Sequence, residues 1–256
     1  RKGDTFVDRA SSAPRCVRAR WYKHNGYEGE LMQPRSLVVF ATGDVVEHVY
    51  KYFIAKACVG PDKLYSEVDF CIENGTFTIQ HREFTIYNQE QIITDYDGLI
   101  VKGHPDGWGK RNSDGEWEVI EIKSSSSYGF DKFVAGEVPD YIKQVHVIMD
   151  SDKGKELGVK SARFFYMNKN TSHIFDRLYD YDPKFSKEIA AEFWAVKGKE
   201  APVRPHDPVQ ETFRRKETGR TILPWQCAYC DYKATCQPDF VREFNNSGKP
   251  IYVKKQ

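Results

Sequence analysis

Asp106, Glu121 and Lys123 are charged residues of the types that bind metal ions and position water. An Asp114-Gly115 pair lies between Asp106 and Glu121 and is a strong turn signal. This turn would fold the chain back, so that Asp106 lies opposite Glu121. Two carboxylates and an amine on one sheet surface suit a divalent-metal site with a charged helper. A solvated hairpin face with an ordinary Glu–Lys pair explains these residues equally well, so other parts of the chain must decide.

The segment 118–123 has to be a strand for this arrangement to form. Its residues alternate between polar and apolar in the way a half-buried strand does. Side chains two positions apart on a strand share a face. Glu121 and Lys123 are therefore predicted to point the same way, while Ile120 and Ile122 point the other way into a core.

The segment 36–57 is predicted to be a helix with an apolar stripe, interrupted by Gly43. Glu47 stacks with Gly43 near the apolar side, where a carboxylate needs a partner or a metal ion. Adjacent helical residues point about 100° apart, so Glu47 and His48 cannot both face inward. We favour Glu47 as a further ligand. A partly exposed glutamate is the alternative, and a shifted register would place His48 at the metal instead.

The C-terminal part of the chain contains the pattern Cys-x2-Cys-x5-Cys, formed by Cys227, Cys230 and Cys236. This is a strong metal-ligand spacing, and tetrahedral sulfur ligation suits zinc or an iron–sulfur cluster. A fourth ligand is needed, and the candidates are Cys16, Cys58, Cys71 and His206. Cys16 is attractive because its surroundings give no other reason for a cysteine. We expect a structural metal that joins the two chain ends rather than a redox or catalytic one.

The segment around Cys16 is rich in arginine and is predicted to form a helix over residues 8–24, with Pro14 as a weak point. It carries Arg15, Arg18 and Arg20. These side chains form either a solvated helix face or a strip that binds phosphates.

The remaining elements follow from hydrophobic patterns and turn signals. Strands are expected over residues 65–72, 76–86, 91–101, 161–167 and 171–180, and helices over 140–150 and 182–196. The first of these helices contains Gln144 and His146, and the second has Pro183 at its first position. The proline-rich segment 202–208 should be extended.

Composition narrows the class of protein. The net charge of +1 over 256 residues argues against a broadly basic coat protein, although a local basic groove is compatible with it. No apolar run approaches the roughly 18–20 residues that a membrane helix needs, and the first residues lack the apolar region of a signal peptide. Six unevenly spaced cysteines do not resemble a secreted disulfide scaffold. A reducing, cytoplasmic setting is expected, in a bacterial, archaeal or phage-infected cell.

Together these residues resemble the PD-(D/E)XK nuclease superfamily. Within it they are similar to the RecB-type branch, which includes the CRISPR-adaptation exonucleases and the iron–sulfur nuclease domain of the AddB helicase-nuclease subunit. The matching nuclease motifs are, in chain order, Gly43-x3-Glu47, Asp106 in Gly103-His104-Pro105-Asp106, Glu121-x-Lys123, and Gln144 of a Gln-x3-Tyr motif. The split iron–sulfur pattern is matched by Cys16, Cys227, Cys230 and Cys236. The motifs span nearly the whole chain.

The chain departs from the family pattern at two positions. Ile148 stands where the family has the tyrosine of Gln-x3-Tyr. Glu47 stands where the CRISPR-adaptation proteins have histidine, although phage exonucleases of the lambda type have glutamate there. The first departure puts in doubt a substrate role for the helix of Gln144.

The resemblance implies an α/β fold with a restriction-endonuclease-like PD-(D/E)XK core, in which a mixed sheet is flanked by helices. It implies a single nuclease domain over residues 1–256, with a catalytic core at about 36–196. Residues 1–35 and 197–256 would form a periphery that holds a 4Fe–4S cluster, or less favourably zinc, and that binds DNA through Arg15, Arg18 and Arg20.

The implied activity is metal-dependent hydrolysis of DNA phosphodiester bonds by an exonuclease that acts on single strands or processes ends, of the CRISPR-adaptation or phage recombination and repair type. Mg²⁺ or Mn²⁺ would be held by Glu47 (or His48), Asp106, Glu121 and the backbone carbonyl of Ile122. Lys123 and Gln144 would complete the catalytic set. An ammonium beside two carboxylates stays protonated, so Lys123 would orient water rather than deprotonate it.

Other functions compete with this one. A non-catalytic nucleic-acid-binding module stabilised by zinc or a cluster explains the cysteines and arginines but leaves Asp106, Glu121 and Lys123 unexplained. A factor in CRISPR adaptation or recombination that depends on a helicase or another protein partner is a second alternative, and a scaffold for protein contacts is a third. Cleavage polarity, strand preference, endonuclease or exonuclease action and oligomeric state do not follow from these motifs.

Overall fold

The computed structural model describes residues 8–31, 34, 37–38, 41–42, 45, 70–73, 76–80, 84–87, 91–137, 140–245, 247–248 and 250–255. The chain divides into two units, which comprise residues 1–14 with 34–191 (unit 1) and residues 15–33 with 192–256 (unit 2). Residues 1–14, which we expected in the periphery, belong to unit 1. Glu47, His48, Gly43 and Cys58 lie outside the described residues.

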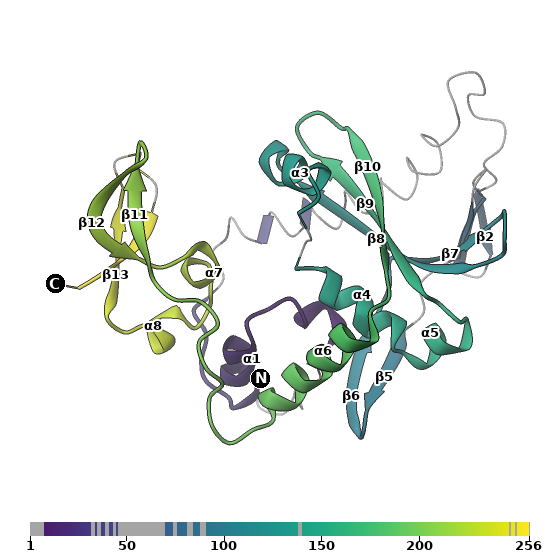
Figure 1. Ribbon diagram of the computed structural model, residues 1–256, viewed down its shortest axis with the longest axis horizontal. Coiled ribbons are helices and arrows are strands. Elements are labelled where there is room, and N and C mark those ends of the chain that lie inside the picture. The colour runs from purple at the N-terminus through teal and green to yellow at the C-terminus, as the bar shows by residue number, and fades with distance from the viewer. Residues whose placement is uncertain are drawn as a thin grey trace. The chain divides into compact units, whose positions relative to one another are not determined.

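Unit 1 contains a seven-stranded mixed sheet with the order β10-β9-β8-β7-β4-β3-β2 (Figure 1). Its strands are β2 (Phe70–Glu73), β3 (Thr76–Gln80), β4 (Phe84–Tyr87), β7 (Gly107–Arg111), β8 (Trp117–Ser125), β9 (Ser161–Asn168) and β10 (Ile174–Asp180). Strands β8 and β9 run parallel, and the other neighbouring pairs run antiparallel. The expected mixed sheet is therefore confirmed.

A smaller sheet in unit 1 has the order β1-β6-β5, with β1 (Asp8–Arg9), β5 (Ile92–Tyr96) and β6 (Leu99–Gly103). The predicted single strand over 91–101 is wrong because Asp97-Gly98 forms a tight turn within it. Asp97 and Gly98 have φ angles of 54° and 92°, and the Gly98 N–H donates to Asp95 Oδ1 at 2.6 Å. The expected strand over 76–86 likewise divides into β3 and β4.

The helices of unit 1 include α3 (Ser127–Val134), α4 (Ile142–Met149), α5 (Asp152–Glu156) and α6 (Pro183–Val196), which continues into unit 2. Helices α3 and α4 cover one face of the large sheet: Phe133 of α3 stacks on Tyr166 of β9 at 4.2 Å between ring centroids. Pro183 begins α6 as predicted, and Asp182 Oδ1 accepts hydrogen bonds from the N–H groups of Lys184 and Phe185. The sheet flanked by helices matches the expected architecture.

The predicted helix over 8–24 is only half right. Residues 8–12 form β1 and the 3-10 turn η1 (Ala10–Ser12), and α1 begins at Val17 and ends at His24. Pro14 explains the difference, since proline lacks an N–H group and keeps the residue before it out of helical geometry. Of the predicted helix over 36–57, the described residues are helical: Leu37, Val38, Ala41, Thr42 and Val45.

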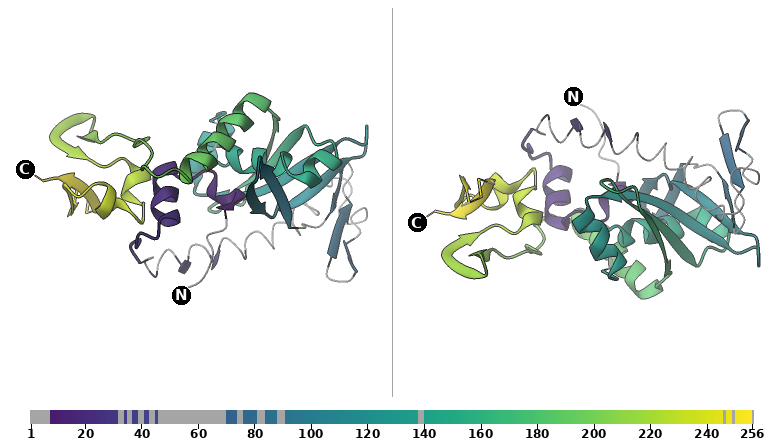
Figure 2. Two further views of the ribbon diagram at one scale, coloured as in Figure 1. Left: turned by 90° about the horizontal axis from the view of Figure 1, so that it is seen from below. Right: turned by 90° about the horizontal axis from the view of Figure 1, so that it is seen from above.

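Unit 2 combines α1 with a four-stranded antiparallel sheet of order β11-β12-β14-β13, seen from two further sides in Figure 2. The strands are β11 (Val209–Phe213), β12 (Lys216–Ile222), β13 (Phe240–Phe244) and β14 (Pro250–Lys254), and the short helices are α7 (Trp225–Ala228) and α8 (Lys233–Cys236). We did not predict this sheet, because most of its side chains are exposed and give little apolar alternation. Among the described residues, no helix has the length and apolar character needed to cross a membrane.

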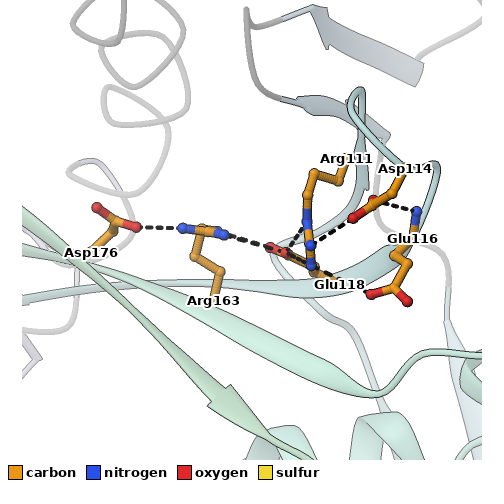
Figure 3. A network of polar contacts seen from close by, with 6 residues as sticks. All are labelled: Arg111, Asp114, Glu116, Glu118, Arg163 and Asp176. Atoms are coloured by element: carbon orange, nitrogen blue, oxygen red, sulfur yellow. Dashed lines mark hydrogen bonds and ion pairs between the residues drawn. The ribbon is translucent and has the colours of Figure 1, made fainter.

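Glu118 of β8 anchors the large sheet by binding arginines from both neighbouring strands (Figure 3). The side chain of Glu118 is buried, with 3% exposed. Arg111 of β7 donates to Glu118 Oε1 at 2.9 and 3.2 Å, and Arg163 of β9 donates to Oε2 at 2.8 Å. Because the two arginines come from the strands on either side, this ion network fixes the register of β7, β8 and β9.

We predict that Glu118→Ala lowers the free energy of unfolding by about 3 kcal/mol, because it leaves two guanidinium groups without their shared buried carboxylate. Chemical denaturation measures the loss. The matched control is Glu116→Ala, since Glu116 is 57% exposed and lies 3.6 Å from Arg111. This variant should change stability by less than about 0.5 kcal/mol. Equal effects of the two variants would contradict the anchoring role of Glu118.

His146 of α4 is buried, and its hydrogen bonds are those of a neutral imidazole. Its Nδ1 bonds to the carbonyl of Ile142 at 2.9 Å, and its Nε2 accepts the N–H of Asp182 at 3.1 Å. One nitrogen therefore donates and the other accepts, as in neutral imidazole. Burial lowers the pKa of His146 and outweighs Asp150 and Asp182, which raise it.

A lowered pKa in the folded state makes stability depend on pH in a defined direction. Below the ordinary histidine pKa of about 6.5 the unfolded chain binds a proton at position 146 that the folded chain does not, so stability falls as pH decreases through this range. We expect His146→Gln to weaken this dependence between about pH 7 and 5. Urea unfolding at several pH values tests it, with the exposed His173→Gln as control. An unchanged pH slope in His146→Gln would argue against a neutral buried His146.

Candidate active site

The turn at Asp114-Gly115 forms as predicted and brings Asp106 to Glu121. Gly115 has a φ angle of 76°, which favours glycine, and its N–H donates to the Arg111 carbonyl at 2.9 Å. Gly107 pairs with Ile120 in the antiparallel ladder of β7 and β8. Asp106, one residue before Gly107, therefore lies beside Glu121.

Glu121 and Lys123 share the face of β8 that is covered by α4. Glu121 is fully buried, and Lys123 Nζ forms an ion pair with Glu121 Oε1. Gln144 of α4 donates from Nε2 to the same oxygen at 2.8 Å. The predicted common direction of Glu121 and Lys123 is confirmed, because their side chains form this ion pair with each other. The structure thus brings together residues from two strands and a helix.

Asp106 interacts with the backbone of β8 as well as with its charges. Its Oδ2 accepts the N–H of Ile122 at 2.7 Å, which places the carboxylate beside the peptide unit between Glu121 and Ile122. Burial lowers the pKa of Lys123, but Glu121 and Asp106 outweigh it, and the net pKa is raised. Lys123 is therefore a fixed ammonium ion between two carboxylates, with 22% of its side chain exposed.

Two tyrosines near Lys123 were missed by the sequence analysis. Lys123 Nζ lies 5.1 Å from the ring centroid of Tyr141, and Tyr166 is the partner of Lys123 in the parallel ladder of β8 and β9. Burial raises the pKa of the Tyr166 hydroxyl, and Tyr141 raises it further. Tyr141 is 41% exposed, so an incoming ligand can reach it. Its position three residues before Gln144 was a signal, since residues three apart meet on one side of a helix.

The oxygen atoms at this site fit a hard divalent cation. The described donors are the carboxylates of Asp106 and Glu121, and the Ile122 carbonyl lies in the same stretch of β8. In the part of the chain that the structure describes, no group of three or more His, Cys, Asp or Glu side chains could hold a metal ion. The expected third side chain, Glu47 or His48, lies outside that part. Mg²⁺ commonly uses one or two carboxylates and completes its shell with water and phosphate oxygens.

The cysteines of the predicted cluster gather in unit 2. Cys16, Cys227, Cys230 and Cys236 are free thiols and line one pocket. His206, the loop histidine that we considered as a ligand, lines the same pocket. Burial and the three neighbouring cysteines raise the pKa of the Cys227 thiol to about 11. Thiolates placed this close repel one another, so a bound cation would stabilise them.

Arg15, Arg18 and Arg20 have three different environments, and Arg15 lies before the start of α1 at Val17. Arg15 is exposed, whereas Arg18 is partly buried, donates to the Pro202 carbonyl at 2.7 Å and lines the cysteine pocket. Arg20 is 3% exposed, and its guanidinium lies 4.0 Å from the ring centroid of Phe193. Arg15 alone among these three presents its charge to solvent, so a phosphate contact stays a prediction for Arg15.

Comparisons with known proteins give distant likenesses. No family model and no curated protein sequence matches the chain. Its structure is similar to that of SSO0001, with 14% identity, 93% of this chain and 89% of that chain covered, and a TM-score of 0.47.

It is also similar to LHK-Exo, an alkaline exonuclease from Laribacter hongkongensis, over 73% of this chain and 88% of that chain. The identity and TM-score are 16% and 0.42 for its complex with dAMP, and 15% and 0.37 for the second structure.

Proposed function

We propose that the protein is a metal-dependent DNA nuclease of the PD-(D/E)XK type that acts as an exonuclease. The observation that carries the proposal is the position of Lys123, whose ammonium is held by the buried Glu121 carboxylate beside Asp106. A purely structural sheet face has no need of this arrangement, because apolar residues of similar volume fill such a position at least as stably. The motif resemblance supplies the reaction class, and the expected setting is the cytoplasm.

The residues of the chain have separate tasks in this reaction. Asp106, Glu121 and the Ile122 carbonyl would hold Mg²⁺ or Mn²⁺, with Glu47 or His48 as the further ligand. When bound, the metal polarises the scissile phosphate and makes a coordinated water more acidic. Gln144 fixes the orientation of the Glu121 carboxylate through its 2.8 Å hydrogen bond.

Lys123 is the positively charged group of the site. Against the effect of burial, Glu121 and Asp106 raise its pKa, which favours the ammonium over an amine that could remove a proton from water. It instead orients the attacking water and offsets the negative charge that develops on the phosphate. Tyr141, exposed beside Lys123, offers a hydroxyl to the same phosphate or to the leaving strand. It thereby supplies the tyrosine that the family motif has at the position of Ile148.

We predict that Lys123→Ala and Asp106→Ala each reduce DNA cleavage with Mn²⁺ by about 100-fold or more, the effect typical of removing one preorganised charge from an active site. End-labelled single strands, duplexes and circles are the substrates, and an exonuclease degrades the linear forms and spares the circles. Lys160→Ala and Asp131→Ala, which remove the same charges from exposed positions of unit 1, are the controls. Undiminished cleavage by Lys123→Ala or Asp106→Ala would show that the site is wrong.

We further propose that Cys16, Cys227, Cys230 and Cys236 hold a 4Fe–4S cluster with a structural role. Four free thiols line one pocket, which supports this ligand set. As they stand in the described residues they form no group that could hold a metal ion, so a bound cluster would have to draw them together. Two cationic groups offset its negative charge: Arg18 interacts with Cys236, and Arg204 interacts with Cys227. Zinc is the alternative for the same thiols.

The cluster proposal predicts a brown protein with iron and acid-labile sulfide after anaerobic purification. Cys230→Ser should lose most of the iron and unfold at lower temperature, because metal binding contributes directly to folding. Cys71→Ser, which changes a cysteine of β2 in unit 1, should keep both properties. A colourless protein with stoichiometric zinc would contradict the cluster and favour zinc.

A further inference from the structure

The hairpin of β11 and β12 turns through two arginines in a backbone conformation that arginine disfavours. Phe213 pairs with Lys216, so Arg214 and Arg215 are the central residues of a two-residue turn. Their φ angles are 49° and 67°. A tight hairpin with positive φ at both positions is the type I′ turn, for which Asn-Gly is the preferred sequence. Side chains with a Cβ atom are strained in this region, and arginine has no short polar group to relieve the strain.

The tip of this hairpin, Phe213–Lys216, carries a concentrated positive charge. Arg214, Arg215 and Lys216 are all exposed. The ion pairs found among the described residues of this sheet join Arg220 to Glu211 and to Glu243, and none of them reaches the tip. The guanidinium carbon of Arg214 lies 5.3 Å from the ring centroid of Phe213, within the range of a cation–π interaction. In the described part of the sheet, the three cations of the tip therefore form no ion pair, and the nearest carboxylate in the sequence is Glu217, directly after Lys216.

The stem of the hairpin is braced independently of the tip. The ladder shifts register at Glu211, which faces the segment Thr218–Arg220. Glu211 is 6% exposed and accepts hydrogen bonds from Arg220 Nε and Nη2 at 2.7 and 2.9 Å and from Thr218 Oγ1 at 2.7 Å. Gly219, with a φ angle of 77°, lies in the bulge. Since Glu211 and Arg220 hold the bulge, the arginines at the tip are not needed to close the hairpin.

We propose that the tip Phe213–Lys216 binds the phosphate backbone of DNA. Guanidinium groups match phosphate oxygens in a bidentate geometry, and a two-residue turn fixes the backbone that carries both arginines, which lowers the backbone entropy lost on binding. Phosphate contacts hold a nucleic acid without reading its sequence, as an exonuclease that proceeds along a strand requires. The choice of DNA rests on the proposed nuclease function, whereas the contact itself is measurable without cleavage.

The test replaces the turn by Arg214→Asn together with Arg215→Gly. The variant removes two charges but installs the preferred type I′ pair, so its stability should not fall and its melting temperature should rise. DNA binding is measured by fluorescence anisotropy with EDTA, so that no cleavage occurs. Two lost phosphate contacts should weaken binding to a duplex about 30-fold at 0.15 M salt and reduce the slope of log K against log salt by about 1.8.

A matched control distinguishes the effect of the tip on DNA affinity from the effect of net charge. Lys155→Gln with Lys160→Gln removes two exposed charges from unit 1 and should change affinity by less than about twofold. Lys216→Gln, which leaves the turn backbone untouched, should lower the salt slope by about 0.9. Equal losses in the control and the turn variant would overturn the proposal, and so would an unchanged salt slope in the turn variant. Undiminished DNA binding with lost binding to anionic lipid vesicles would assign the tip to a membrane surface instead.

The failure of this proposal differs from the failure of the nuclease function. The turn variant should lose the same affinity in EDTA with and without Lys123→Ala, and it should still cleave at saturating DNA with a raised KM, whereas Lys123→Ala should not cleave. A wild-type chain that binds DNA through the tip and cleaves nothing with Mn²⁺ would remove the nuclease assignment and keep the tip. A turn variant that binds and cleaves like the wild type would remove the role of the tip and keep the nuclease assignment.

Discussion

The buried carboxylate of Glu118 holds β8 in place, and the candidate active site depends on that strand. Arg111 from β7 and Arg163 from β9 bind this carboxylate from its two sides. Successive side chains on a strand point to opposite faces, so a slip of one residue would turn the charges of the site to the wrong side of the sheet. An ion network on one face therefore fixes the geometry of Glu121 and Lys123 on the other.

The two buried carboxylates of β8, Glu118 and Glu121, have different surroundings. Glu118 is enclosed by two guanidiniums and contributes order to the sheet. Glu121 is fully buried, and its partners among the described residues include the Lys123 ammonium and the Gln144 amide, while Lys123 keeps a partly exposed side chain next to the exposed ring of Tyr141. A buried carboxylate is stable only with partners that satisfy it. Glu121 has such partners, and the adjoining side chains of Lys123 and Tyr141 reach solvent.

The features that could be predicted from the sequence are those that neighbouring residues determine. Asp114-Gly115 lies between segments that alternate, and its turn places Asp106 without any long-range information. The predictions fail where a local signal lies inside an apparently continuous pattern, as with Pro14 in the N-terminal helix and Asp97-Gly98 in a long strand. Tyr166 could not be assigned to the site at all. Its position beside Lys123 follows from the parallel register of β8 and β9. These two strands are separated in the sequence by α3, α4 and α5.

Unit 2 contains two places where the residues are not the ones that the local structure favours. An Asn-Gly turn would close the β11–β12 hairpin with less strain than Arg214-Arg215, and the Glu211–Arg220 pair already braces the stem. The thiol of Cys227 is likewise destabilised as an anion by its cysteine neighbours, where apolar residues would pack without repulsion. Sequences keep such local conflicts where a ligand later resolves them. In the two proposals for unit 2, a phosphate would resolve the first conflict and a metal the second.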